Sequence, residues 1–222
     1  KAVRADCSSR LIMESIPHLP ALRRGKAYES LDKSQLVDHR TGQALVAISQ
    51  VNAGIVRKDL GRIAESRGVL KRFTVAQLLE ICARAGEEFL NSTLPLGDKG
   101  HTQTPQQYIE TLSRTSGLPH NMVRRNMAKI NDSLSHMREV LNGLTRGLPL
   151  EVIDKGIGEQ NGSRVCFYPR TRALGVVMPS NSPAVNSLWL PAIPLKLPVV
   201  LKPGREEPWT PYRLIQAFIA AG

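Results

Sequence analysis

Apolar runs near the start of the chain predict two short strands within residues 36–49. The turn Arg40-Thr41-Gly42 separates them, and a glycine flanked by apolar runs is typical of a strand pair. The residues before this pair show no regular pattern, so we expect an irregular opening.

Beyond the strand pair, apolar positions recur at helical spacing. A helix is expected over 52–68, and Thr74 and Thr104 are typical residues at the start of two more. The proline that follows Thr104 suits the first turn of a helix. Further helices are expected over 123–144. We therefore expect residues 1–147 to form a mainly helical part.

The pattern changes near residue 148, where a strand hairpin is expected over 148–171. The segments PLEVIDKG and SRVCFYPR are strand-like, and the pair Asn161-Gly162 between them is a common turn signal. Cys166 falls inside the second strand. Because a nucleophilic cysteine usually needs an electropositive setting, often at a helix start, this position favours a structural thiol.

Residues 172–222 predict a strand, a helical crossover, a second strand and a further helix. The runs 174–178 and 197–201 are apolar without alternation, as expected of strands buried on both faces. The segment 184–196 is long enough for a helix between parallel strands. The last helix is expected to begin near Pro211. Its expected apolar face carries Leu214, Ile215, Phe218 and Ile219.

Two polar residues, Asn181 and Lys202, stand just past the ends of these two strands. In an open parallel sheet, ligands bind beyond the carboxyl ends of the strands, so both side chains are candidates for one crevice. A turn at each place explains the pattern equally well, because Asn, Pro and Gly are common turn residues.

Composition narrows the function classes. The chain of 222 residues carries a net charge of +11, but the basic residues are dispersed and aromatic residues make up only 5%. Neither feature favours a nucleic-acid partner. No apolar run approaches the roughly 18 residues that cross a bilayer, and the first residues lack the apolar core of a signal peptide. We expect a cytoplasmic protein without a membrane partner.

The cysteines and histidines indicate no metal site. Cys7, Cys82 and Cys166 are an odd number and widely spaced, which argues against a disulfide framework and structural zinc. Cys82 lies on the apolar face of a predicted helix and is interpreted as an inert core thiol. The histidines also lack the spacing of metal ligands. They are His18, His39, His101, His120 and His136.

The two strand ends, GVVMPSNSP and VVLKPG, resemble the aldehyde dehydrogenase superfamily. There, a strand ends in Pro-x-Asn-x-Pro, a helix follows, and a second strand ends in Val-Leu-Lys-Pro-Ser/Gly. The detailed match covers about 172–222, with Trp189 and Pro208 also in place. Further upstream, only the order of elements agrees. The resemblance implies an α/β fold: a helical layer, an oligomerisation-type hairpin, and the start of a parallel Rossmann-like sheet that binds NAD or NADP.

The resemblance also implies roles for single residues. Asn181 matches the asparagine whose amide helps to form the oxyanion hole for the thiohemiacetal. Lys202 matches the lysine that contacts the adenosine ribose. The other implied cofactor positions lie on the same two strand ends: Val177, Met178, Pro179, Ser180, Gly204, Arg205 and Glu206.

Three departures from the family pattern affect these expectations. Ser180 replaces an aromatic or apolar residue of the family pattern, so the part of the site that lines the nicotinamide ring is expected to be more polar than in the family. The interval from Trp189 to Lys202 is about two residues shorter than usual. Arg205 stands where many NAD-preferring members have a glutamate, which favours the 2′-phosphate of NADP, whereas a shift of one residue would let Glu206 bind the ribose and favour NAD.

By resemblance, the chain is the N-terminal part of an NAD(P)-dependent enzyme that oxidises an aldehyde. The cysteine nucleophile and the glutamate general base follow the matched region in that family, so they are expected outside this chain. The hairpin at 148–169 matches an oligomerisation element and implies a homo-oligomer. A non-catalytic homologue that keeps the scaffold is the alternative, and a basic polyanion-binding module is a weaker one.

Overall fold

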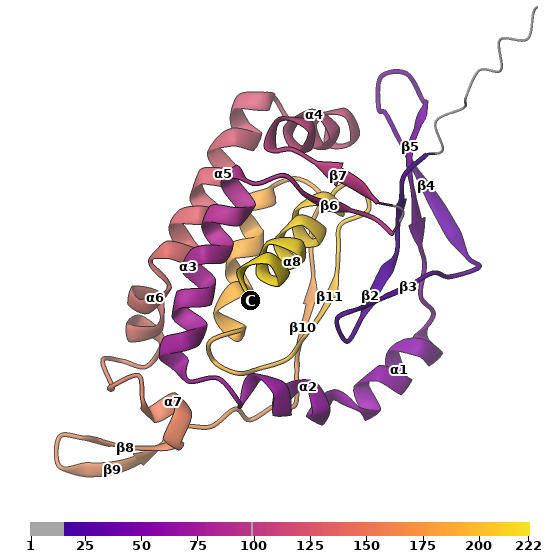
Figure 1. The fold of residues 1–222 in the computed structure, drawn as a ribbon. Helices are drawn as coiled ribbons and strands as arrows, with labels where there is room; N and C mark the ends of the chain where they lie inside the picture. Colours follow the sequence, from indigo (N-terminus) through magenta and orange to yellow (C-terminus); the bar gives the residue numbers. More distant parts are fainter. Residues whose placement is uncertain (1–15, 99) are drawn as a thin grey trace, which may run out of the picture.

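The structure is a computed structural model that describes residues 16–98 and 100–222 (Figure 1). Its strands are β1 (His18–Leu19), β2 (Ala21–Arg23), β3 (Lys26–Tyr28), β4 (Lys33–Val37), β5 (Ala44–Ser49), β6 (Leu94–Leu96), β7 (His101–Gln103), β8 (Ile157–Gln160), β9 (Ser163–Cys166), β10 (Leu174–Val177) and β11 (Val199–Lys202).

The helices complete an α/β fold. They are α1 (Ala53–Gly61), α2 (Ile63–Leu70), α3 (Val75–Asn91), α4 (Pro105–Ser116), α5 (His120–Ser135), α6 (Met137–Leu144), α7 (Val152–Lys155), α8 (Trp209–Ala221) and the 3-10 helices η1 (Pro183–Leu188) and η2 (Leu190–Ala192). In Figure 1, α3 packs against α5 and α8, while β1 to β5 lie on the opposite side of the molecule. Among the described residues, none of the helices has the length and apolar character that a membrane span requires.

The predicted strand pair around Arg40-Thr41-Gly42 is confirmed as β4 and β5, which pair antiparallel. The carboxylate of Asp38 accepts the Arg40 backbone N–H, and Gly42 takes a φ of +71°, which closes the turn. The prediction of an irregular segment before this strand pair was wrong for the described residues from 16 onward. They form β1, which extends the sheet in parallel with β5, and the antiparallel pair β2–β3.

Both predicted helix starts at Thr74 and Thr104 are confirmed. The hydroxyl of each threonine accepts the backbone N–H of the glutamine three residues later. The side-chain oxygen of that glutamine accepts the backbone N–H of the threonine, so both helices begin with a capping box. Cys82 is fully buried on α3, as expected, and burial raises the pKa of its thiol to about 12. Cys7 lies outside the described residues.

The single helix expected over 52–68 is two helices. Asn52 caps α1 as its oxygen accepts the Ile55 N–H, but the chain turns at Arg62, whose backbone N–H donates to Asp59. Gly61 precedes this turn and weakens the helix there. Gly68 does not close α2, because its backbone stays helical and α2 continues to Leu70.

The first strand of the predicted hairpin at 148–171 was misplaced. PLEVIDKG contains the short helix α7, and the first strand is β8. A tertiary contact explains the difference: the Asp154 carboxylate accepts the Val75 N–H at the start of α3 and pairs with Lys196. The turn is as predicted, with Asn161 and Gly162 both at positive φ.

The strand–crossover–strand unit is confirmed, with two differences. β10 and β11 pair in parallel, but the crossover consists of 3-10 turns because its prolines have no N–H to donate to an α-helix. The strands are also not buried on both faces, since Val177 is 77% exposed. One face of this two-stranded sheet packs on the core through Leu174 and Val176, and the other is open in the described chain.

Helix α8 begins at Trp209, two residues before the predicted start. Leu214 lies on its buried face as expected, but Ile219 is 60% exposed and was wrongly placed there. The buried face instead includes Arg213, which is only 2% exposed. Its guanidinium donates to the carbonyls of Phe89 (3.0 Å), Ser92 (2.6 Å) and Gln103 (2.9 Å).

Replacement of Arg213 by Met is expected to destabilise the protein by about 3 to 5 kcal/mol, because three buried carbonyls lose a charged donor. Urea unfolding at pH 7, followed by the fluorescence of the buried Trp189 and Trp209, measures the loss. Arg125→Met on the exposed face of α5 is the control and is expected to have little effect. Equal unfolding midpoints for the two variants would contradict the role of Arg213.

Candidate functional site

The loops that follow β10 and β11 lie side by side at one edge of the parallel pair. Val177 is opposite Lys202 in the register, and the backbone N–H of Met178 donates to the Lys202 carbonyl (2.9 Å). The ladder therefore continues to the last residue of β11. Both loops leave the sheet at its carboxyl edge, where ligands bind in open α/β sheets.

Gly204 sets how closely these two loops approach. A Cβ at this position would lie 2.6 Å from the Pro179 carbonyl oxygen and 2.6 Å from Ser180 Oγ. The Ser180 hydroxyl in turn accepts the backbone N–H of Glu206 (3.2 Å). The absence of a side chain at Gly204 thus allows a loop–loop contact that larger residues would prevent.

The edge exposes an amide and two cations. Asn181, Lys202 and Arg205 are all exposed, and the Arg205 side chain is 91% accessible. Its nearest charged partner is Glu206, with 4.0 Å between Nε and Oε1. An exposed pair of this length contributes little, so the guanidinium is free to contact an anionic ligand.

Residues of the first loop differ in what they present. Pro179 is exposed and Ser180 is half-buried, as a ligand-facing loop requires. Val177 points its side chain to the open face of the sheet. Met178 does not fit the expected role as a lining side chain, because it is 7% exposed and belongs to the hydrophobic core.

Buried hydrogen bonds hold the second loop from below. The carbonyl of Glu206 accepts the Thr115 hydroxyl (2.7 Å), and Thr115 also accepts the Trp209 indole N–H (3.0 Å). Thr115 lies in α4, so these bonds tie the loop after β11 to the helical layer. Neither Thr115 nor Trp209 belongs to the quoted strand-end motifs, and their roles depend on contacts across more than 90 residues.

Glu207 is a buried acid that the sequence analysis missed. One carboxylate oxygen accepts the Thr210 N–H (2.8 Å) and lies close to the Thr210 hydroxyl, while Oε2 has no partner. Burial raises its pKa to about 7. Glutamate is not among the usual helix-capping residues, so the sequence shows neither its bond to Thr210 nor its depth of burial.

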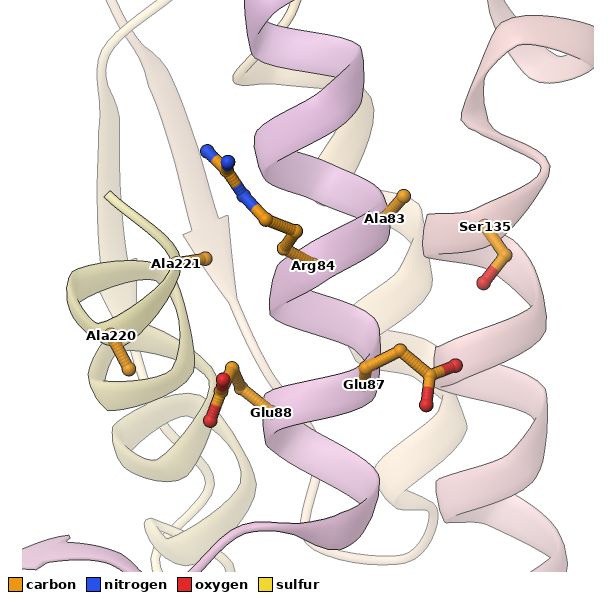
Figure 2. Close-up of a pocket in the computed structure, with 7 residues that line it drawn as sticks. All are labelled: Ala83, Arg84, Glu87, Glu88, Ser135, Ala220 and Ala221. Carbon is orange, nitrogen blue, oxygen red and sulfur yellow. The ribbon is translucent and has the colours of Figure 1, made fainter.

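Two depressions of the described surface lie outside the strand-end loops. Figure 2 shows one of them, between α3, α8 and the end of α5. Its lining residues are Ala83, Arg84, Glu87, Glu88, Ser135, Ala220 and Ala221. The other lies between the β4–β5 turn, the end of α4 and the start of α5. Neither shares a residue with the strand-end loops, and the described cysteines also lie in other elements, in α3 and at the end of β9.

The α/β fold of the chain is similar to that of solved aldehyde and semialdehyde dehydrogenases. These structures superimpose on 90% or more of the chain, with sequence identities between 13% and 17%. No protein-family model and no curated protein sequence matches the chain. The fold is thus shared, while the sequence has diverged far.

Particular structures illustrate the likeness. The NAD-dependent benzaldehyde dehydrogenase of Corynebacterium glutamicum matches with a TM-score of 0.67 and 16% identity, covering 90% of this chain and 41% of that one. An aldehyde dehydrogenase of Brucella melitensis biovar abortus 2308 matches with a TM-score of 0.70 and 13% identity, over 96% of this chain and 41% of that one. An NADP-dependent enzyme of E. coli matches with a TM-score of 0.70 and 13% identity, over 93% of this chain and 40% of that one. The chain spans about two fifths of the length of these chains.

Gly204→Ala is expected to separate the two loops, because its Cβ meets the Pro179 backbone, which cannot turn aside, as well as the Ser180 hydroxyl. Overpacking of this kind typically costs about 1 to 3 kcal/mol, which thermal unfolding detects. Gly175→Ala in β10 is the matched control, since a Cβ there meets nothing within 4 Å. If both alanines leave the melting temperature unchanged, the close approach of the loops is not a constraint.

Proposed function

We propose that the chain is the N-terminal part of an NAD(P)-dependent, aldehyde dehydrogenase-like oxidoreductase. The observation that carries this proposal is the packed pair of strand-end loops, which exposes Asn181, Lys202 and Arg205 at one edge. The aldehyde dehydrogenase fold supports it. In this proposal, residues 172–222 begin the Rossmann-like sheet, and 1–147 are the remainder of the cofactor-binding domain.

The cofactor is NAD or NADP, and the second loop binds its adenosine half. The Lys202 ammonium donates to ribose hydroxyls, while the buried Gly204 keeps the second loop packed against the first. Arg205, exposed and weakly paired, suits a 2′-phosphate and hence NADP. Glu206 is the competing ribose contact, but its backbone is held on both sides by Ser180 and Thr115.

Catalysis by the complete protein uses the first loop. The Asn181 amide donates to the oxyanion of a thiohemiacetal that a cysteine outside this chain forms with an aldehyde. NAD(P)⁺, held by the two loops, would supply the hydride acceptor. Val177, Pro179 and Ser180 line the nicotinamide side, with Met178 supporting them from the core. The Ser180 hydroxyl accepts the Glu206 N–H, so its main role in this proposal is to hold the two loops together.

The β8–β9 hairpin is the proposed site of homo-oligomerisation, within residues 148–169. Ile157 in β8 is 60% exposed, and Tyr168 just after β9 is 70% exposed. In Figure 1 the hairpin projects away from the helical layer. Exposed apolar side chains on a projecting strand pair suit pairing with a second copy.

Arg205→Glu is expected to reduce the preference for NADP over NAD, because the new carboxylate repels a 2′-phosphate and accepts ribose hydroxyls. Dissociation constants of NADPH and NADH for the complete protein, measured by fluorescence titration, give the ratio. Arg125→Glu is a charge-matched control on α5. An unchanged ratio contradicts the assignment of Arg205, and the absence of binding for either cofactor at millimolar concentration contradicts the nucleotide site.

Asn181→Ala in the complete protein is expected to lower kcat by roughly 100- to 1,000-fold, as the loss of one oxyanion donor does. The affinity for NAD(P)H is expected to stay unchanged. Asn121→Ala, on the exposed face of α5, is the control. Steady-state kinetics with a panel of aldehydes measures the effect. Absence of turnover in the unmodified protein, together with intact cofactor binding, would favour the non-catalytic alternative.

A further inference from the structure

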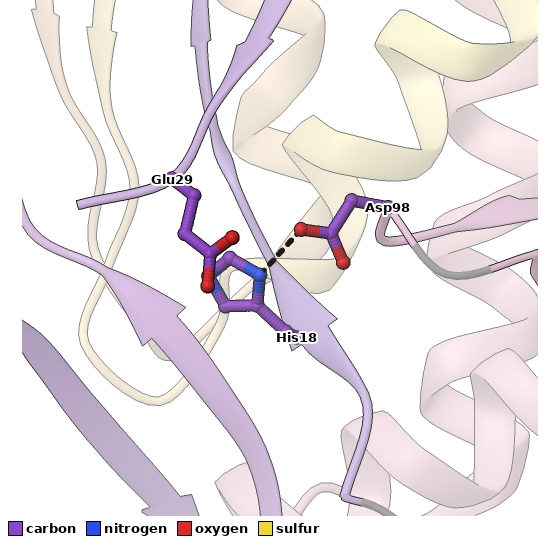
Figure 3. Close-up of side chains that lie close together, drawn as sticks. All are labelled: His18, Glu29 and Asp98. Carbon is purple, nitrogen blue, oxygen red and sulfur yellow. Dashed lines mark hydrogen bonds and ion pairs between the residues drawn. The ribbon is translucent and has the colours of Figure 1, made fainter. Parts of the chain in front are cut away.

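Three potential metal ligands that do not belong to the strand-end loops converge in the structure (Figure 3). They are His18 in β1, Glu29 just after β3, and Asp98 in the turn between β6 and β7. One ligand atom of each lies within 4.8 Å of those of the other two. Because 11 and 69 residues separate them along the chain, sequence spacing gave no indication of a metal site.

Both ring nitrogens of His18 have a partner in the structure. The ring is 3% exposed, and its Nε2 lies 2.9 Å from the Ser49 hydroxyl, which also accepts the backbone N–H of Ser30 (2.9 Å). On the other side, Nδ1–H donates to Asp98, because a carboxylate oxygen 2.7 Å away can only accept. A metal on Nδ1 would replace this proton, and the Ser49 hydroxyl would then accept Nε2–H and orient the ring, as second-shell acceptors do for metal-bound histidines.

The Asp98 side is equally constrained by the fold. Gly97 has a φ of +77°, and a Cβ there would lie 2.2 Å from the His18 carbonyl oxygen, so only glycine permits this approach. The Tyr212 hydroxyl of α8 donates to the Gly97 carbonyl (3.2 Å). These contacts place Asp98 Oδ2 2.7 Å from His18 Nδ1.

The charges of the cluster also favour a cation. Glu29 and Asp98 are both carboxylates, and the Lys33 ammonium donates to Glu29. The lysine therefore neutralises one carboxylate, and a divalent ion at the centre would neutralise both.

We propose that His18, Glu29 and Asp98 form a structural site for a divalent first-row transition metal, with Zn²⁺ as the best fit. One imidazole and two carboxylates are ligands that Zn²⁺ binds at about 2.0 to 2.2 Å, and water supplies the fourth position. Neighbouring ligands of such an ion lie about 3 to 4 Å apart. To admit the ion, His18 Nδ1 and Asp98 Oδ2, which are 2.7 Å apart, would separate slightly, and the exposed Glu29 side chain would turn toward them. The nitrogen ligand disfavours Mg²⁺ and Ca²⁺, which prefer oxygen alone.

The metal would clamp the N-terminal sheet to the β6–β7 turn, so its binding is expected to raise thermal stability. At 100-fold excess over the dissociation constant, Zn²⁺ is expected to raise the melting temperature by about 5 to 10 °C, reversibly with EDTA. Calorimetric titration with Zn²⁺ gives the stoichiometry. Glu29→Gln and Asp98→Asn are each expected to weaken binding at least tenfold. Co²⁺ should show ligand-field absorption bands that both substitutions alter.

Two further variants make the outcome decisive. Lys33→Gln removes the cation that competes for Glu29 and is expected to tighten Zn²⁺ binding. His120→Ala removes an exposed histidine and is expected to change nothing. If Zn²⁺ leaves the melting temperature unchanged, or binds all these variants with equal affinity, the cluster is a hydrogen-bonded ion pair only and the proposal is overturned.

Discussion

The buried guanidinium of Arg213 is the interaction on which the arrangement of the helical layer depends. It donates to two carbonyls at the end of α3 and one in β7, and it lies over the rings of Phe89 and Tyr108. Burial lowers its pKa to about 10, so it remains charged near neutral pH. A cation at the carboxyl end of a helix is favoured by the helix dipole. One side chain of α8 thus closes the end of α3 and fixes α8 against it.

The position of α8 determines the strand-end loops. Because α8 begins at Trp209, its indole reaches Thr115 and its first turn holds Glu207. The loop after β11 therefore enters α8 at a fixed angle, and Gly204 meets the loop after β10. The same helix carries Tyr212, which anchors the β6–β7 turn beside His18. The proposed cofactor edge and the proposed metal site share one support.

Local chemistry was predictable from the sequence, and long-range packing was not. Thr74 and Thr104 cap helices through hydrogen bonds to residues three positions away, so the short segment around each threonine is enough to predict its role. The parallel pair followed from two apolar runs and their spacing. By contrast, α7 has a strand-like sequence, and its form depends on Asp154 reaching Val75. The expectation of a helical crossover failed because its prolines cannot complete an α-helical ladder.

The same distinction separates the residues of the two proposed sites. Asn181 and Lys202 stand out because each follows a strand, and the parallel register brings them to one edge whatever the rest of the chain does. Nothing in the sequence marks His18, Glu29 and Asp98 as a group. His18 and Asp98 meet because Gly97 lets its own backbone approach that of His18. Because solved aldehyde dehydrogenases are only about 15% identical to the chain, the likeness to them shows the fold alone. The three proposed metal ligands depend on a close contact between the backbones at Gly97 and His18, which no short segment of the sequence encodes, so only the folded chain brings them together.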